Sequence, residues 1–239
     1  MKRALKWIGL VVLLLAIALG AVLYSAFGHT RSIEDGSEPA PGVRTVKDAF
    51  VSVFVLDAGG GKVALIDAGK DKDGDAILAE LKRRGLDAKA VAAIFLTHGH
   101  GDHTAACGLF PAATVYAMPS ESSVIGDACP IGHALRDGEA VTVGDVRVEA
   151  FAVPGHTPGS AVYLARGVLF FGDSAGGGKD GKLMQAVTLF SKRPEQNVAS
   201  LKALATRLAP RAAEIKTLAF AHSGPLAGFA PLQAFAAAH

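Results

Sequence analysis

The sequence predicts an α/β fold preceded by one N-terminal helix. Short apolar runs alternate with amphipathic segments along most of the chain, and polar side chains follow several of these runs directly. Half of the 239 residues are apolar, which is enough to build a sizeable core. The N-terminal stretch differs, because no charge interrupts its apolar residues. We therefore expect one globular domain with an N-terminal appendage.

The N-terminal stretch has the length and the charge pattern of a membrane span. Residues 7–27 form a run of about 21 residues without a charge, which is long enough to cross the hydrocarbon core of a bilayer. Lys2, Arg3 and Lys6 precede the run, and the positive-inside rule then keeps the N-terminus in the cytoplasm. We expect residues 1–28 to anchor the protein in the membrane, with the remaining domain outside the cytoplasm, periplasmic or extracellular. The alternative is a cleaved signal peptide, which would leave the protein secreted.

The rest of the chain divides into a linker and a domain. Residues 29–44 are rich in Glu, Asp, Gly, Ser and Pro and are predicted to be a linker, and residues 45–239 are predicted to form the domain. The domain pattern predicts two hairpins and two amphipathic helices. The hairpins are expected at 50–66, around a triple-glycine turn, and at 141–153; the helices are expected at 75–84 and 195–208.

Histidine and aspartate side chains follow four of the predicted strands. The apolar run 91–96 leads directly into Thr97-His98-Gly99-His100-Gly101-Asp102-His103. His156, Asp173 and His222 each follow a further apolar run. Loops at strand ends commonly carry ligands, and these residue types hold divalent metals while leaving a position for water. The pattern predicts two metal sites built from seven side chains: His98, His100, Asp102, His103, His156, Asp173 and His222.

These motifs resemble those of the metallo-β-lactamase fold superfamily, a group of mostly hydrolytic enzymes with an αββα sandwich. The resemblance covers most of residues 45–235 and rests on the 97–103 motif, Gly155-His156-Thr157-Pro158-Gly159-Ser160, Gly172-Asp173 and His222. It implies that His98, His100 and His156 form a first metal site. It implies a second site of Asp102, His103 and His222, and Asp173 would bridge the two ions. Two Zn²⁺ are the expected cofactors, although the same ligands accept iron or manganese.

The implied centre predicts a hydrolase of a small-molecule substrate. Two ions about 3.5–4 Å apart would hold a bridging hydroxide near neutral pH, as in other two-metal hydrolases. This hydroxide would attack an ester, lactone, thioester or related bond, and the ions would stabilise the developing oxyanion. Asp102 is the expected catalytic residue, because it can carry a proton toward the leaving atom.

The resemblance also narrows the substrate. Asp173 stands where relatives that cleave β-lactams usually have cysteine or serine, so glyoxalase-II-like, lactonase-like and phosphodiesterase-like branches are favoured over a β-lactamase. Glyoxalase II carries a C-terminal helical domain for its glutathione thioester, whereas this chain ends soon after His222, so a typical glutathione site is not expected. A β-lactamase stays open as a less favoured alternative, and so do two other classes. One is an oxidoreductase resembling the mononuclear iron persulfide dioxygenases, against which the full set of seven ligands speaks; the other is a non-catalytic metal-binding domain.

Charge argues against one class of partner. The net charge is only +2, and the sequence has no basic stripe interleaved with aromatic residues. Nucleic acid is therefore not an expected partner. Nothing in the sequence specifies an oligomeric state.

The segment 174–193 and the two cysteines complete the expectations. The segment is predicted to be a long flexible loop that could cap the substrate cleft or lie on the surface as an ordinary loop. Cys107 and Cys129 could pair in an oxidising compartment, but the sequence does not give the distance that a disulfide requires. Because Cys107 follows the metal motif on a predicted helix, a small buried hydrophobe is its expected role. Neither cysteine is assigned to catalysis.

Overall fold

The computed structural model describes residues 2–127 and 129–239; within the N-terminal helix it describes the side chains at positions 6–17, 20, 21 and 24. The chain forms two compact units, Met1–Thr30 and Arg31–His239. The two units are described separately below.

The first unit consists mainly of one helix, α1 (Lys2–Phe27), where the sequence predicts a transmembrane segment. Among the described residues, no helix offers an apolar stretch long enough to cross a membrane. The predicted membrane anchor is therefore not supported. Part of the predicted span, at positions 18, 19, 22, 23 and 25–27, lies outside the side chains that the structure describes.

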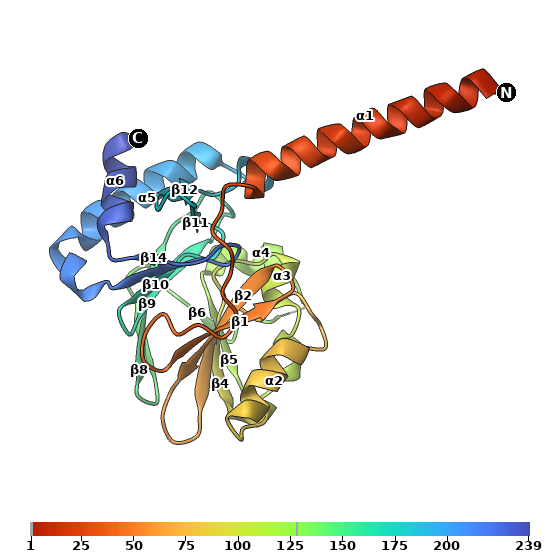
Figure 1. The fold of residues 1–239 in the computed structure, drawn as a ribbon. Coiled ribbons are helices and arrows are strands. Elements are labelled where there is room, and N and C mark those ends of the chain that lie inside the picture. The colour runs from red at the N-terminus through yellow and green to blue at the C-terminus, as the bar shows by residue number, and fades with distance from the viewer. Residues whose placement is uncertain (1, 128) are drawn as a thin grey trace. The chain divides into compact units, whose positions relative to one another are not determined.

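In the described part of the second unit, two six-stranded sheets carry the fold (Figure 1). The first sheet follows the chain in order: β1 (Val43–Asp48), β2 (Val51–Asp57), β3 (Val63–Ile66), β4 (Val91–Phe95), β5 (Thr114–Ala117) and β6 (His133–Ala134). The second sheet has the order β14 (Leu226–Ala227), β13 (Thr217–Ala219), β10 (Val168–Phe170), β9 (Ala161–Ala165), β8 (Val146–Ala152) and β7 (Ala140–Val143). A separate hairpin pairs β11 (Ala175–Gly177) with β12 (Leu183–Gln185).

Helices accompany the sheets at several points. The α-helices of this unit are α2 (Asp75–Arg83), α3 (Gly101–Thr104), α4 (Ser122–Ile125), α5 (Pro194–Leu208) and α6 (Ala230–Ala238). The 3₁₀ turns are η1 (Ala88–Ala90), η2 (Cys107–Leu109), η3 (Pro119–Glu121), η4 (Thr188–Phe190) and η5 (Ala209–Glu214). Both predicted hairpins and both predicted amphipathic helices are confirmed, with α2 and α5 in the expected places.

Strand β2 shows why the strand sequences are almost continuously apolar. Its Phe54 and Leu56 belong to the core between the two sheets, whereas its Val53 and Val55 belong to the core on the opposite face. Successive side chains of a strand point to opposite faces. A strand that is covered on both faces therefore needs apolar residues at every position.

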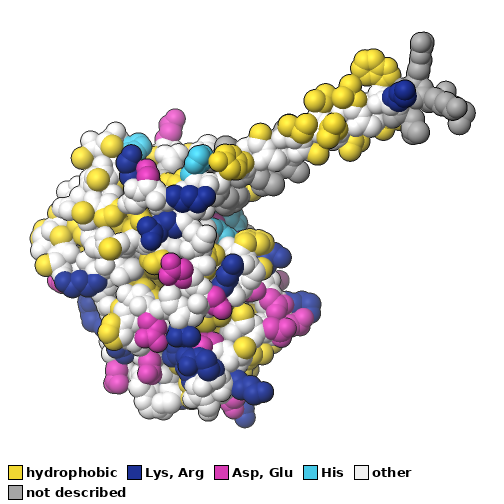
Figure 2. Space-filling view, viewed as in Figure 1, with side chains coloured by type: hydrophobic (Ala, Val, Ile, Leu, Met, Phe, Trp, Pro, Cys, Tyr) yellow, Lys and Arg dark blue, Asp and Glu magenta, His cyan; other side chains and the backbone are white. Residues whose placement is uncertain are grey.

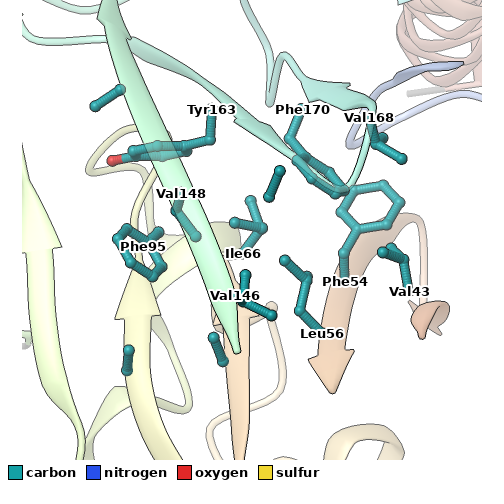
Figure 3. Packing of buried hydrophobic residues seen from close by; sticks show 14 of the residues in the cluster. Val43, Phe54, Leu56, Ile66, Phe95, Val146, Val148, Tyr163, Val168 and Phe170 are labelled. Carbon is teal, nitrogen blue, oxygen red and sulfur yellow. The ribbon is translucent and has the colours of Figure 1, made fainter. Parts of the chain in front are cut away.

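Three apolar clusters hold the layers together. Between the sheets, Phe54 and Phe95 of the first sheet pack with Tyr163 and Phe170 of the second, as Figure 3 shows. Helix α2 packs on the outer face of the first sheet, and α5 and α6 pack on the outer face of the second. This arrangement confirms the αββα sandwich that the resemblance implies.

Strand direction explains why distant parts of the chain meet at one edge of the sandwich. Strand β10 is parallel to β13, and both β8 and β10 are antiparallel to β9. Strands β8, β10 and β13 therefore run the same way, and their carboxyl ends lie at the same edge of the second sheet. The segments that carry His156, Asp173 and His222 all begin at this edge.

Two predicted irregular segments are more ordered than expected. Most of the predicted linker 29–44 belongs to the second unit, where Arg31 N donates to Gly177 O at 2.8 Å and the Asp35 carboxylate accepts from Lys47 N at 2.8 Å. The predicted flexible loop 174–193 contains the β11–β12 hairpin and η4. Buried Asn197 on α5 fixes this segment, since its side chain donates to Ser174 O and accepts from Ala186 N. Isolated polar residues such as Asn197 give no periodic signal in a sequence.

On the face of the second unit seen in Figure 2, acidic and basic side chains are interspersed. That face shows no continuous basic stripe of the kind that tracks a nucleic-acid backbone.

Candidate metal centre

Three histidines from two loops converge at the first of two candidate sites. His98 and His100 follow β4, and His156 follows β8. His100 Nδ1 lies 3.0 Å from His98 Nε2 and 3.1 Å from His156 Nε2. Tetrahedral zinc with Zn–N bonds near 2.05 Å would separate its ligand nitrogens by about 3.3 Å. We call His98, His100 and His156 the first triad.

The remaining ligand candidates form a second group beside it. Asp102, His103 and His222 offer ligand atoms that lie within 4.8 Å of one another, and we call them the second triad. His222 Nε2 lies 3.3 Å from Asp102 Oδ2, and His103 Nε2 lies 3.9 Å from the same oxygen. Asp102 and His103 of the second triad lie on the short helix α3, which follows β4 of the first sheet, whereas His222 follows β13 of the second sheet. The second triad therefore combines residues from both sheets.

Asp173 lies between the two triads. Its Oδ2 faces the first triad, at 3.9 Å from His98 Nε2 and 3.6 Å from His156 Nε2. Its Oδ1 faces the second triad, at 3.3 Å from His103 Nε2 and 3.2 Å from His222 Nε2. The structure thus brings together all seven residues that the sequence singles out, with one carboxylate oxygen directed at each triad.

Hydrogen bonds to the outer ring nitrogens orient the two buried histidines of the first triad. Thr97 donates its hydroxyl to Asp67, so its oxygen accepts from His98 Nδ1 at 3.1 Å. Ser191 donates its hydroxyl to the Val187 carbonyl, so its oxygen accepts from His156 Nδ1 at 3.2 Å. Both Nε2 atoms are then left with a lone pair for a cation, which is the usual arrangement around metal-binding histidines.

The second triad is oriented in the same way by different acceptors. His103 Nδ1 donates to Asp67 Oδ2 at 2.8 Å, and His222 Nδ1 donates to the Phe50 carbonyl at 2.9 Å. Asp67 also accepts from the backbone N–H and the hydroxyl of Thr97, so one buried carboxylate supports the second triad directly and the first through Thr97. Asp67 has a φ of 62°, a strained conformation for a residue other than glycine. Such strain persists where the surrounding structure fixes the residue for a function.

The donor set fits a pair of metal ions. His103 Nε2 and Asp173 Oδ1 are buried and lie 3.3 Å apart, but the geometry between them is not that of a hydrogen bond. Buried polar atoms without a partner are rare and costly, and a cation between them would satisfy both. Imidazole nitrogen with carboxylate oxygen is the ligand chemistry of Zn²⁺, and it also suits iron and manganese.

The electrostatic surroundings of the histidines differ between the two triads. Burial lowers the pKa of His98 well below its ordinary value and lowers the pKa of His156 to about 4. Burial alone would also lower the pKa values of His103 and His222, but carboxylates outweigh it. Asp173 and Asp67 raise the pKa of His103 well above its usual range, and Asp102 and Asp173 raise the pKa of His222 to about 10.

Apolar side chains flank the centre on two sides. Phe50 is 52 % exposed and stacks on His222 with ring centroids 5.6 Å apart, and the ammonium of Lys70 lies 5.3 Å from the Phe50 ring. Leu189 and Phe190 are 64 % and 48 % exposed and directly precede Ser191, the partner of His156. In the second unit, these three are the exposed large hydrophobic residues among those described. Exposed apolar groups beside a polar centre are typical of a ligand-binding site.

Cys107 and Cys129 form a disulfide, with Cα atoms 5.5 Å apart. The pairing that the sequence left open is therefore made, and Cys107 is also buried in the apolar cluster on the outer face of the first sheet, as expected. Sequence spacing alone does not reveal this pairing.

A model of the Metallo-beta-lactamase superfamily matches residues 46–222. The chain belongs to this superfamily. Solved structures of the same fold include a metallo-beta-lactamase family protein from Thermus thermophilus, with a TM-score of 0.65 at 24 % identity over 83 % of this chain and 79 % of that one. The Rm3 metallo-beta-lactamase has a TM-score of 0.62 at 20 % identity over 87 % and 91 % of the two chains. At these identities the likeness shows the fold alone.

Curated relatives of this superfamily member share more sequence. Two are named hydroxyacylglutathione hydrolase. The protein of Dechloromonas aromatica (strain RCB) is 36 % identical over 61 % of this chain and 50 % of its own length. The protein of Fuscovulum blasticum is 33 % identical over 68 % of this chain and 60 % of its own length. The chain thus spans half to three fifths of the length of these relatives.

Sequence reasoning missed the groups that hold the ligands in place. Asp67 follows the apolar run 63–66, which is the same signal that identified Asp173 after 168–172, so it could have been found. Thr97 and Ser191 carry no comparable signal, because single hydroxyl residues occur throughout the chain.

Proposed function

We propose that this protein is a binuclear metal-dependent hydrolase that cleaves small-molecule thioesters. The observation that carries the proposal is the position of Asp173, which directs one carboxylate oxygen at each of two ligand triads. A mononuclear iron oxidoreductase would need only one metal site and would not use the second triad as ligands. The first triad would hold one Zn²⁺, the second triad would hold another, and Asp173 would touch both.

When bound, such ions supply Lewis acidity and an activated water near neutral pH. The chain's own residues would then position the substrate and move protons. Asp102 is 25 % exposed on its side chain, so it can exchange protons with solvent while it faces His222. We propose that Asp102 carries a proton toward the leaving sulfur or oxygen. An Asp102→Asn variant that keeps both metals but turns over at the unchanged rate would refute this role.

The thioester assignment rests on the curated relatives and agrees with the flanks of the centre. A hydroxyacylglutathione is a thioester, and relatives with that name match this chain at 30–38 % identity. Phe50 offers an apolar surface beside His222, and Lys70 adds a positive charge next to that surface. A substrate with an apolar acyl group and a carboxylate would satisfy both contacts.

Metal content and a substrate panel test the proposal together. We expect about two zinc ions per chain by elemental analysis, and faster hydrolysis of thioesters than of matched oxygen esters, lactones, phosphodiesters and a cephalosporin. One iron per chain would favour the oxidoreductase instead. Metal-replete protein that cleaves nothing in the panel would favour a non-catalytic metal-binding domain.

We also propose that the domain works in an oxidising compartment outside the cytoplasm. The Cys107–Cys129 disulfide supports this, because structural disulfides persist in such compartments and are rare in reducing ones. Thiol labelling of the protein in intact cells tests it. No labelled cysteine before reduction and two after reduction are expected, whereas two labelled cysteines before reduction would contradict the proposal.

A further inference from the structure

A second buried carboxylate, Glu121, lies close to the first triad without belonging to it. Glu121 ends η3, directly before α4, and its side chain has no exposed surface. Its Oε2 accepts a hydrogen bond from Gly99 N at 2.7 Å, and its Oε1 accepts one from Gly159 N at 2.6 Å. Each oxygen of this one carboxylate thus binds the backbone of a different loop.

The two loops are those that supply the first triad. Gly99 stands between His98 and His100, in the loop after β4 of the first sheet. Gly159 lies three residues after His156, in the loop after β8 of the second sheet. Glu121 therefore ties together two loops that come from opposite sheets of the sandwich. The distance between those loops sets the distance between the histidine nitrogens.

The packing around the carboxylate leaves little room for adjustment. A Cβ atom at position 99 would lie 2.8 Å from the backbone nitrogen and Cγ1 of Ile125 on α4. A Cβ atom at position 159 would lie 2.8 Å from the backbone nitrogen of Glu121 and 2.9 Å from its Cγ. Glycine at both positions lets the two backbones reach the carboxylate directly.

A carboxylate is the side chain that suits this position. Both groups that face it are N–H donors, and an ionised carboxylate has two oxygens that only accept. A glutamine would present its own N–H₂ group to one of the two donors. Among the described residues, no lysine or arginine forms an ion pair with Glu121. The backbone N–H groups of Gly99 and Gly159 are therefore the donors that stabilise this carboxylate.

We propose that Glu121 is a positioning residue for the first triad. By holding the loops at 98–100 and 156–159 together, it fixes the three histidines at the spacing that a cation requires, and so sets the affinity of this triad for metal. The inference rests on the proposed metal centre. It assigns no contact between Glu121 and the ion, and it predicts an effect on the first triad alone.

Zinc affinity measured on the full chain tests the proposal. In a His222→Ala background, which keeps the first triad, Glu121→Gln is expected to weaken zinc binding by about 10–100-fold, as substitution of outer partners of metal ligands usually does. In a His98→Ala background, which keeps the second triad, the same change is expected to leave the affinity within about twofold. The matched control is Glu139→Gln, because Glu139 also accepts a backbone N–H, from Arg136, but lies away from the triads. It should leave both affinities unchanged.

Other outcomes would distinguish a failure of the positioning role from a failure of the proposed metal centre. An unchanged affinity in the first background, or an equal loss in both, would overturn the positioning role while leaving the metal centre intact. Zinc-free wild-type protein would overturn the metal centre and this inference with it. If Glu121→Gln does not fold, Glu121→Asp keeps both oxygens but shortens their reach, and a smaller loss confined to the first triad is expected. Hydrogen exchange in the wild type gives a measurement without variants: slow exchange at the Gly99 and Gly159 amides is expected, and fast exchange would contradict the contact.

Discussion

The two ligand triads are built on opposite electrostatic principles. The first triad consists of histidines alone, and burial keeps the pKa of His156 at about 4 and that of His98 well below its ordinary value. In the second triad, carboxylates raise the pKa of His222 to about 10 despite its burial. At neutral pH His98 and His156 therefore present uncharged nitrogens, whereas His222 holds a proton that a cation would have to displace. Two neighbouring groups of the same ligand types can thus differ in electrostatics because carboxylates lie closer to one of them than to the other.

The residues that hold the ligands of the two triads in place by hydrogen bonds differ as well. His103 of the second triad is held by a direct hydrogen bond to Asp67. The loops of the first triad are held through their backbones by Glu121. A different buried carboxylate thus supports each triad most directly, although Asp67 also reaches the first triad through Thr97.

The largest effect is expected where the two triads share a ligand. Asp173→Ala removes the carboxylate that faces both, so we expect zinc content to fall below one ion per chain and kcat/KM to fall by more than about 100-fold, beyond the range for outer partners. Elemental analysis and steady-state kinetics measure both. The control is Asp180→Ala, because the Asp180 side chain is 59 % exposed and bonds to nearby Lys182 rather than to a residue of either triad. Retention of two zinc ions in the Asp173 variant would contradict the shared role.

Asp67→Asn should separate the triads. The amide places a donor where His103 Nδ1–H needs an acceptor, so we expect zinc affinity at the second triad to fall by about 10–100-fold. Zinc affinity at the first triad should fall by a smaller factor, because Asp67 contacts this triad only indirectly, through Thr97 and His98. Chelator competition in the His98→Ala and His222→Ala backgrounds resolves the two sites. Asp71→Asn, which changes a surface carboxylate that accepts backbone N–H groups, is the control. A larger loss at the first triad would reverse the account of Asp67.

We expect zinc affinity to depend on pH differently at the two triads, because the pKa values of their histidines differ. His103 and His222 have raised pKa values, and a pKa of about 10 keeps His222 protonated at pH 7 before a cation binds. Zinc affinity of the second triad should therefore rise with pH, by about tenfold per pH unit for each proton displaced, and should level off above about pH 10. His98 and His156 have lowered pKa values and are already deprotonated, so neither should make zinc affinity at the first triad depend on pH above about pH 6. Equal slopes for the two triads in calorimetric titrations would contradict this assignment.

The smallest expected effect concerns the flanks of the centre. Phe50→Ala removes the ring that stacks on His222, and we expect KM for an apolar acyl thioester to rise roughly 3- to 10-fold with kcat nearly unchanged. Leu189→Ala on the other side provides the comparison. If the acyl group lies on the second-triad side, the Phe50 variant should show the larger rise. The opposite order would place the acyl group beside the first triad.

The sequence predicts the ligands better than it predicts their supports. His98, Asp173 and their partners were identifiable because metal-binding residue types recur at the ends of apolar runs, and strand direction brings such ends together. The strands β1, β5 and β9 were not predicted. Strand β9 contributes only Ala161–Ala165, a buried run too short for periodicity to distinguish strand from helix.

The residues behind the ligands depend on tertiary distances. Glu121 is one acidic residue in a polar segment, and only the meeting of loops from two sheets gives it a role. The Cys107–Cys129 pair depends in the same way on how the segment between the two residues folds back. The local sequence pattern predicts neither the role of Glu121 nor the disulfide.

Anomalous diffraction at the zinc edge, from crystals of the zinc-loaded chain, would show whether the seven ligands hold two ions. We expect two peaks, one among the nitrogens of His98, His100 and His156 and one among Asp102, His103 and His222, with an oxygen of Asp173 beside each. A single peak, or rings of His156 and His222 turned away from the 98–103 loop, would contradict this expectation.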